Sequence, residues 1–208
     1  MPAVNTDWSA FETEFRSCTK CEAAGFIPAA RPLTLISPKA KVYLVGQAPS
    51  RTDHETHGFY VGPAGEKLKG WLVSAGFAPD ALGTTIYATA MTRCFPGRKP
   101  GMSTDRAPSR AEQKLCSTWM DRELALLDIR LIIPFGAMSI NRFLGAGSLT
   151  ERIGNVFDYQ GIPVVPLPHS SGASTWLNSQ ENKGRLAAAP FPVGHQGRPR
   201  GHRVDPWQ

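Results

Sequence analysis

Short hydrophobic runs alternate with amphipathic stretches along most of this chain. The runs are rich in β-branched and aromatic residues, which is typical of strands buried in a parallel sheet, and they cover 41–45, 85–91, 131–135 and 163–167. Helical spacing of apolar residues is found at 7–18, 68–75, 109–127, 137–144 and 178–188. Strands that alternate with helices predict a parallel sheet with helices on both faces.

One long polar segment, 46–65, joins the first predicted strand to the helix after it. It reads GQAPSRTDHETHGFYVGPAG, and we expect a long loop that bears Gln47, Asp53, His54, Glu55, His57 and Tyr60. Loops of this length are more often functional than idle. In parallel sheets ligands bind beyond the carboxyl ends of the strands, so this segment should meet the residues that follow the other strands.

His169 directly follows the fourth predicted strand, so we expect it at the same sheet edge as Gln47, 90–94 and Gly136. A neutral imidazole there can donate a hydrogen bond to charge that develops on a leaving group, which makes His169 a candidate catalytic residue. The backbone amides of the 46–49 turn are candidate ligand contacts.

Length and charge narrow the class of protein. A chain of 208 residues suits one α/β domain, which we place at 1–189, followed by a basic Pro/Gly/Arg-rich tail at 190–208 that we expect to be loosely ordered. The net charge of +6 suggests an anionic partner, by default nucleic acid. Phosphate contacts are expected from the basic cluster of Arg93, Arg98, Lys99, Arg106 and Arg110. With neither an apolar run of membrane length nor a signal-peptide pattern, a cytoplasmic monomer is expected.

The four cysteines form a CxxC pair, Cys18 and Cys21, and two distant single residues, Cys94 and Cys116. In a reducing compartment this pattern favours a metal site over disulfides. Four thiolates suit a 4Fe-4S cluster or a zinc ion equally well, so the spacing leaves both open.

Taken together, these segments resemble the iron-sulfur uracil-DNA glycosylases, families four and five of that superfamily. Segment 46–65 aligns without gaps with the family-four motif GEAPGxxEDxxGxPFVGxAG. YATAMTRCFPGRKP resembles the family-five stretch around AVRCAPPxNKP, and PLPHSSGAS occupies the place of the HPS motif. The resemblance covers roughly 15–186.

The resemblance implies an α/β/α sandwich with a central four-stranded parallel sheet, a 4Fe-4S cluster on the four cysteines, and excision of uracil from DNA in the cytoplasm, at the nucleoid. In the family, an aromatic residue at the position of Tyr60 stacks on the flipped base and the histidine at His169 supports the uracil anion. The same likeness implies base contacts from Gly46, Gln47, Ala48, Ala90 and Ser170, DNA contacts from Arg93, Arg98 and Lys99, and a loop that wedges into the duplex at Ser171, Gly172, Ala173 and Ser174.

The chain departs from the family where acids are expected. Ala48 replaces the aspartate of the best-known family, Gln47 replaces the family-four glutamate, and Ala90 replaces an asparagine. His57 also stands where the motif has a glycine, so we expect a different turn there. Our hypothesis is that Asp53 or His54 positions the attacking water.

Two other functions remain open on the sequence. One is a uracil-DNA or abasic-site binding protein of the same fold that is non-catalytic or captures the sugar covalently through His54 or His57. The other, an unrelated nucleotide-binding protein, is disfavoured because 46–50 has no phosphate-cradling glycine pattern.

Overall fold

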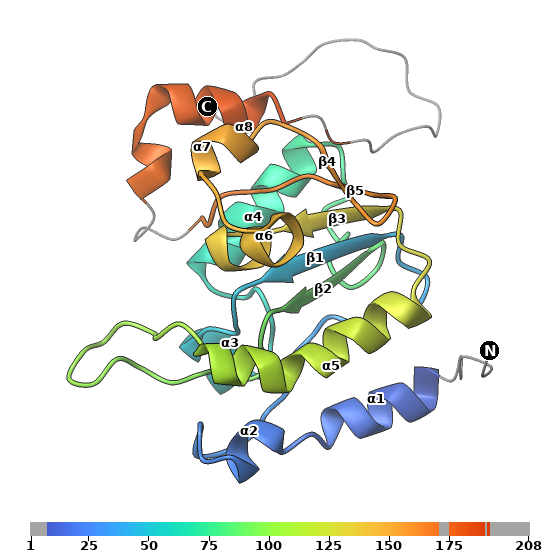
Figure 1. Ribbon diagram of the computed structural model, residues 1–208, viewed down its shortest axis with the longest axis vertical. Helices are drawn as coiled ribbons and strands as arrows, with labels where there is room; N and C mark the ends of the chain where they lie inside the picture. The colour runs from blue at the N-terminus through green and yellow to red at the C-terminus, as the bar shows by residue number, and fades with distance from the viewer. Residues whose placement is uncertain (1–7, 171–174, 190, 192–208) are drawn as a thin grey trace.

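Five strands form one sheet in a computed structural model that describes residues 8–170, 175–189 and 191. The order across the sheet is β2 (Ile86–Ala90), β1 (Val42–Gly46), β3 (Leu131–Pro134), β5 (Ile162–Val164) and β4 (Phe157–Tyr159) (Figure 1). The first four of these run parallel, as predicted. Apart from Phe191, the expected tail at 190–208 lies outside the described residues.

The fifth strand, β4, was not predicted, so the expectation of a purely four-stranded parallel sheet is corrected. It pairs antiparallel with β5 through a turn at Gln160 and Gly161, where both residues have a positive φ, 55° and 83°. Its three residues are too few to give a periodic pattern. The fourth predicted strand is real but shorter than 163–167, and its pairing continues to a single bridge between Phe135 and Leu167.

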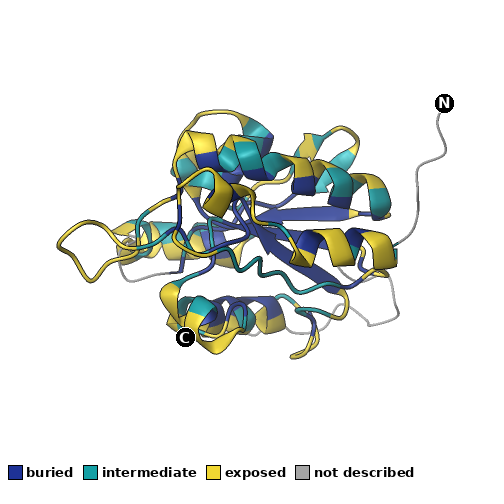
Figure 2. Ribbon diagram, turned by 90° about the horizontal axis from the view of Figure 1, so that it is seen from below, coloured by how far each residue is buried: buried dark blue, intermediate teal, exposed yellow. Residues whose placement is uncertain are grey.

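Side chains on the two faces of the sheet belong to two separate cores, because successive strand residues point in opposite directions. Leu44 and Ile133 pack in one core with Leu68, Trp71 and Leu72 of α4 (Pro63–Ser74). The other core contains Tyr43, Val45 and Ile132 with Met120 of α5 (Arg110–Leu126). Figure 2 shows the buried strands in dark blue between helices that are yellow on their outer sides. The three-layer α/β/α fold is thus confirmed.

The remaining helices complete the two outer layers. In chain order they are α1 (Trp8–Arg16), α2 (Lys20–Ala23), α3 (Arg51–Thr56), α6 (Ala137–Leu144), α7 (Leu149–Arg152), a 3₁₀ turn η1 (Thr175–Asn178) and α8 (Gln180–Ala187). Among the described residues, no helix has the length and apolarity needed to cross a membrane.

A helix that the sequence reading missed, α3, interrupts the segment 46–65, which we expected to be a continuous loop. Ser50 and Asp53 form its capping box, in which each side chain accepts a backbone N–H of the other residue. His57 ends the helix in a left-handed conformation with φ 57°. The family motif has glycine at this position, and a left-handed C-terminal residue explains that preference.

Residues 33–35 run beside the outer strand β2. The backbones of Leu35 and Ala88 exchange two hydrogen bonds of 2.8 and 3.2 Å, and the Leu33 amide donates to the Arg93 carbonyl at 2.7 Å. The connector before β1 is therefore fixed against the sheet.

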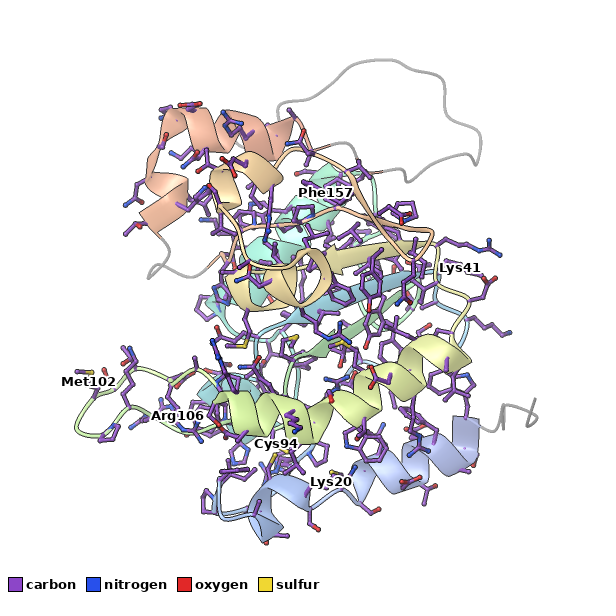
Figure 3. All side chains as sticks on the ribbon, in the orientation of Figure 1. Lys20, Lys41, Cys94, Met102, Arg106 and Phe157 are labelled. Atoms are coloured by element: carbon purple, nitrogen blue, oxygen red, sulfur yellow. The ribbon has the colours of Figure 1, made fainter. Side chains whose placement is uncertain are left out.

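A hairpin at 97–106 joins β2 to α5 and extends away from the sheet (Figure 1). Arg98 pairs with Asp105 in an antiparallel bridge, and the Lys99 amide donates to the Thr104 carbonyl at 3.0 Å. Met102 lies at its far end and Arg106 at its base (Figure 3). Arg106 donates to both carboxylate oxygens of Glu112 at 2.7 Å, which fixes the base to the start of α5.

Candidate active site

A cavity of about 270 Å³ opens at the carboxyl ends of the strands, where the segment after β1 meets the residues after β3 and β5. One water molecule takes about 30 Å³, so this space has room for a small planar ring. Its wall contains the 46–48 turn, the start of α4, Phe135 and His169. The structure therefore brings together Gly46, Gln47, Ala48, Asp53, Tyr60 and His169, all predicted as site residues.

Aromatic rings form one side of the cavity. Phe135 and His169 are stacked with ring centroids 4.9 Å apart, and Tyr60 meets Phe135 edge-on at 6.2 Å. The ring centroids of Phe59 and Tyr60 are 4.4 Å apart. The Tyr60 hydroxyl donates to the Thr89 carbonyl at 3.3 Å, and burial raises the pKa of this phenol well above its usual value. The ring is thus a neutral, fixed wall suited to a flat ligand.

Two glycines allow Tyr60 to lie where it does, with a left-handed φ of 57°. A Cβ on Gly65 would run into the Tyr60 backbone, and a Cβ on Gly46 would run into the Tyr60 hydroxyl. Glycine at both positions lets the backbone approach Tyr60 closely, and the aromatic wall depends on this close approach.

His169 is half-buried, two residues after the bridge at Leu167 that extends the pairing of the last parallel strand. Burial lowers its pKa below the ordinary 6.5, so the imidazole is neutral at neutral pH and can act as a hydrogen-bond donor without carrying charge. The next residue, Ser170, donates from its hydroxyl to the Ala64 carbonyl at 2.7 Å and ties this segment to α4. Ser170 is thus an anchor beside the cavity. The predicted wedge, Ser171 to Ser174, lies outside the described residues.

Asp53 lines the cavity, but its carboxylate has structural partners on both oxygens. Oδ2 accepts from the amide of Ser50 at 2.9 Å and from its hydroxyl at 2.7 Å, while Oδ1 accepts from the Val61 amide at 3.0 Å. Only 5% of the residue is exposed. These contacts make Asp53 the residue that holds α3 and the Tyr60 turn together, and they speak against the hypothesis that it positions water.

His54 and Ala90 are not among the residues that line the cavity, which corrects two expectations. The His54 ring packs against Phe95 with centroids 5.7 Å apart, on a different side of α3 from Asp53. Ala90 is fully buried at the end of β2, and its carbonyl accepts a hydrogen bond from the Arg93 guanidinium. Neither residue is placed to contact a base in this cavity.

Arg93 is buried, so the prediction that it contacts DNA is wrong. Its guanidinium is 2% exposed and pairs with Glu123 at 2.6 Å. Tyr87 donates to the same carboxylate at 3.0 Å, and Tyr43 donates to its other oxygen. Burial opposes the charge of Arg93, but the Glu123 carboxylate more than offsets it and raises the pKa of Arg93. Arg98 and Lys99, in contrast, are exposed on the hairpin.

The four cysteines line a second, narrower cavity, between α2, the end of β2 and α5. All four are free thiols, and three of them, Cys21, Cys94 and Cys116, are buried. Figure 3 shows Cys94 between α5 and the N-terminal segment that carries Lys20. Trp119 donates from its indole N–H to the Cys18 sulfur at 3.3 Å. Four residues from three distant parts of the chain thus meet at one place.

The donor set suits a soft metal centre. Among the described residues, however, no three His, Cys, Asp or Glu side chains are gathered as they would be around a single metal ion. Four thiols are the ligands of both a zinc ion and a 4Fe-4S cluster. Burial and the neighbouring thiols raise the pKa of Cys21 to about 11, and burial raises that of Cys94 to about 12. Metal binding at these residues would therefore release protons.

Among the residues of the first cavity that were not predicted as site residues are Phe59, Phe135 and Asp105. Phe135 is the last residue of the predicted strand 131–135, so the rule about the carboxyl ends of strands that selected His169 also applied to it. Phe59 precedes Tyr60 within the motif. No sequence pattern indicated Asp105. It lies in a proline- and glycine-rich stretch, and the hairpin at 97–106 brings it to the cavity.

The fold and this cavity define a class: α/β proteins that hold a flat ligand beyond the carboxyl ends of a parallel sheet. A family model described as the uracil DNA glycosylase superfamily matches residues 33–189, which is more than half of the chain. The chain therefore belongs to the uracil-DNA glycosylase superfamily.

Three curated relatives are similar to this chain, and two of them are uracil-DNA glycosylases. A type-4 uracil-DNA glycosylase of Sulfurisphaera tokodaii is 28% identical over 178 residues, which span 82% of this chain and 76% of the relative. One of Pyrobaculum aerophilum is 28% identical over 126 residues, or 59% of each protein. A DNA polymerase of Bacillus phage SP01 is 26% identical over 133 residues, 64% of this chain but 13% of the phage protein. For the last two, this chain spans less than two thirds of the relative.

Proposed function

We propose that this protein excises uracil from DNA by hydrolysing the N-glycosidic bond, with the nucleotide flipped into the cavity lined by Tyr60 and His169. The observation that carries the proposal is the cavity itself, in which a neutral histidine and an aromatic wall face a turn of backbone amides. A glycosidic bond inside a duplex is out of reach, so extrusion of the base is required, at a cost of roughly a few kcal/mol.

Cleavage leaves an anionic base and a cationic sugar, and the residues of the cavity suit the first of these charges. The pKa of His169 is lowered by burial, so a neutral imidazole is available to donate a hydrogen bond to the uracil oxygen that gains charge. The 46–48 backbone lies on the same cavity and supplies amide groups near the base. Tyr60 stacks on the flat face of the ring. Together these contacts favour departure of uracil as an anion.

We further propose that Cys18, Cys21, Cys94 and Cys116 hold a 4Fe-4S cluster, with zinc as the alternative. When bound, such a cluster would join α2, the end of β2 and α5 through four metal–sulfur bonds. Iron analysis and visible absorption of the purified protein separate the two, because zinc thiolates are colourless. We expect Cys94→Ser to lose the absorption, and Ser117→Ala, at a partly exposed position of α5, to keep it.

DNA contact is proposed for Arg98 and Lys99, which are exposed beside the cavity mouth, and for the segment 171–174. The protein would then act as a monomer on uracil-containing DNA, in the cytoplasm at the nucleoid. Replacing both basic residues by glutamine should weaken DNA binding uniformly across sequences. The slope of the binding constant against salt concentration, both as logarithms, should fall by the amount that about two phosphate contacts contribute.

One assay tests the main proposal. The protein is incubated with DNA containing a single uracil or, as control, thymine at the same position; abasic sites are then cleaved with alkali, and the products are run on a denaturing gel. Strand breaks in the uracil DNA alone mean excision. A slow-moving protein–DNA band means covalent capture, and neither product means binding only.

Non-catalytic binding is the second candidate, and a specific observation favours it: Gln47, Ala48 and Ala90 stand where the family has its usual water-activating groups, two acids and an asparagine. Capture through His54 has no such support, because its ring packs against Phe95 and not in the cavity.

A further inference from the structure

The proposed excision needs a group on the sugar side of the cavity. Loss of uracil leaves positive charge at the sugar C1′, and water has to be directed to that carbon and relieved of a proton. No residue described so far serves this purpose, because His169 suits the base side and the inherited positions hold Gln47, Ala48 and Ala90.

Two carboxylates line the cavity, Asp53 and Asp105, and their surroundings differ. Both oxygens of Asp53 accept hydrogen bonds that fix the α3 capping box and the Val61 amide. Asp105 is exposed, and within the described residues a single hydrogen bond reaches it, from the Arg51 amide to Oδ2 at 3.2 Å. Its Oδ1 is therefore available to a water molecule or a sugar.

Asp105 is also held in position. Its backbone pairs with Arg98 across the hairpin, and the next residue, Arg106, donates from its amide to the Gly97 carbonyl at 2.9 Å. Arg106 in turn makes a two-pronged ion pair with Glu112, which itself accepts the Ser109 amide at 2.7 Å. A carboxylate held this way on an exposed hairpin costs little desolvation.

From this arrangement we infer that Asp105 is a catalytic residue, the carboxylate that positions the attacking water and accepts its proton. This inference rests on the proposed uracil excision. The N-glycosidic bond breaks and its electron pair leaves with uracil, the water oxygen bonds to C1′, and the water proton passes to Asp105 and then to the released base. Water and the deoxyuridine are consumed, and free uracil and an abasic sugar are formed.

The main test compares Asp105→Asn with the wild-type protein and with Asp80→Asn, an exposed carboxylate outside the cavity lining. Asparagine keeps the carbonyl oxygen that the Arg51 amide needs, so the hairpin is preserved and only the charge is lost. We expect excision under single-turnover conditions to fall roughly hundredfold or more for Asp105→Asn. Binding to uracil-containing DNA should be unchanged or tighter, and Asp80→Asn should match the wild type.

A rescue experiment separates a chemical role from a structural one. Formate supplies a small carboxylate, so it should restore part of the excision lost in Asp105→Ala but none of that lost in Asp53→Ala. If the wild type is active and Asp105→Asn excises uracil as fast as Asp80→Asn, the role of Asp105 is overturned but the excision reaction is not. A wild-type protein that leaves uracil-containing DNA intact overturns the excision reaction itself.

Discussion

Two cavities form near the carboxyl ends of the strands: the cysteine cavity, lined by the four cysteines, and the base-sized cavity, lined by Tyr60 and His169. Side chains hold the first in place, and backbone holds the second. Side chains build the cysteine cavity: four thiols, with the buried pair of Arg93 and Glu123 next to them. Backbone builds the other, through the Tyr60 conformation and the bare Cα atoms of Gly46 and Gly65. The two sites should therefore fail in different ways when they are mutated.

The largest effect is expected at Glu123. Its removal leaves the Arg93 charge buried without its carboxylate, which typically costs 3–5 kcal/mol, so Glu123→Ala should lower the free energy of unfolding by about that much. Urea unfolding followed by circular dichroism measures the loss. The matched control is Asp128→Ala, which removes an exposed carboxylate paired with Lys41 and Arg130 and should cost far less, because exposed pairs contribute little. Equal losses in the two variants would show that the buried pair does not stabilise this side of the sheet.

At the base-sized cavity, His169→Ala should slow excision about a hundredfold, because one donor to a developing anion contributes about 3 kcal/mol. Its stability should change far less than that of Glu123→Ala. Single-turnover release of uracil measures the rate. Wild-type turnover in this variant would remove His169 from the reaction.

Backbone control of the cavity is tested by Gly46→Ala. The new methyl group meets the Tyr60 hydroxyl, and overpacking of this kind costs about 1–3 kcal/mol. Adding Tyr60→Phe should recover most of the loss, because the next atom of the ring is 3.4 Å away, an ordinary contact. Gly70→Ala, on an open face of α4, should stabilise slightly. If the double variant is no more stable than Gly46→Ala, the close approach is not the cause.

The smallest effect is expected at His57, which ends α3 with a left-handed backbone. Glycine adopts that conformation without strain, so His57→Gly should raise the free energy of unfolding by about 0.5 kcal/mol after the entropy of the unfolded chain is counted. Thr56→Gly, one residue earlier in the helix, should have the opposite sign. Thermal unfolding of both variants measures the difference, and a destabilised His57→Gly would contradict this account of the turn.

The contrast between a cavity built by side chains and one built by backbone also explains which features could be predicted from the sequence. The buried parallel strands depend on residue types at short spacings, so they were predicted correctly. The strand β4 was missed because a three-residue partner in a hairpin has no period of its own. Arg93 was misread because it was grouped with basic residues further along the chain, such as the exposed Arg98 and Lys99, while its partner Glu123 is supplied by a helix 30 residues away.

The candidate site was harder to predict where position depends on a turn. His169 could be placed because it follows a strand. Asp53 was in the right segment, but the capping box that occupies its carboxylate becomes visible only once 51–56 is seen as a helix. Asp105 was absent from the prediction, since no periodicity links a hairpin to the cavity beside it.

The two outer strands of the sheet have a consequence for the protein in solution. An unpaired strand edge is a template on which another chain can form β-structure and aggregate. Here β2 is covered in part by 33–35, and at the other side β4 offers only three residues, one of them Asp158. Both borders of the sheet are thus poor templates for aggregation.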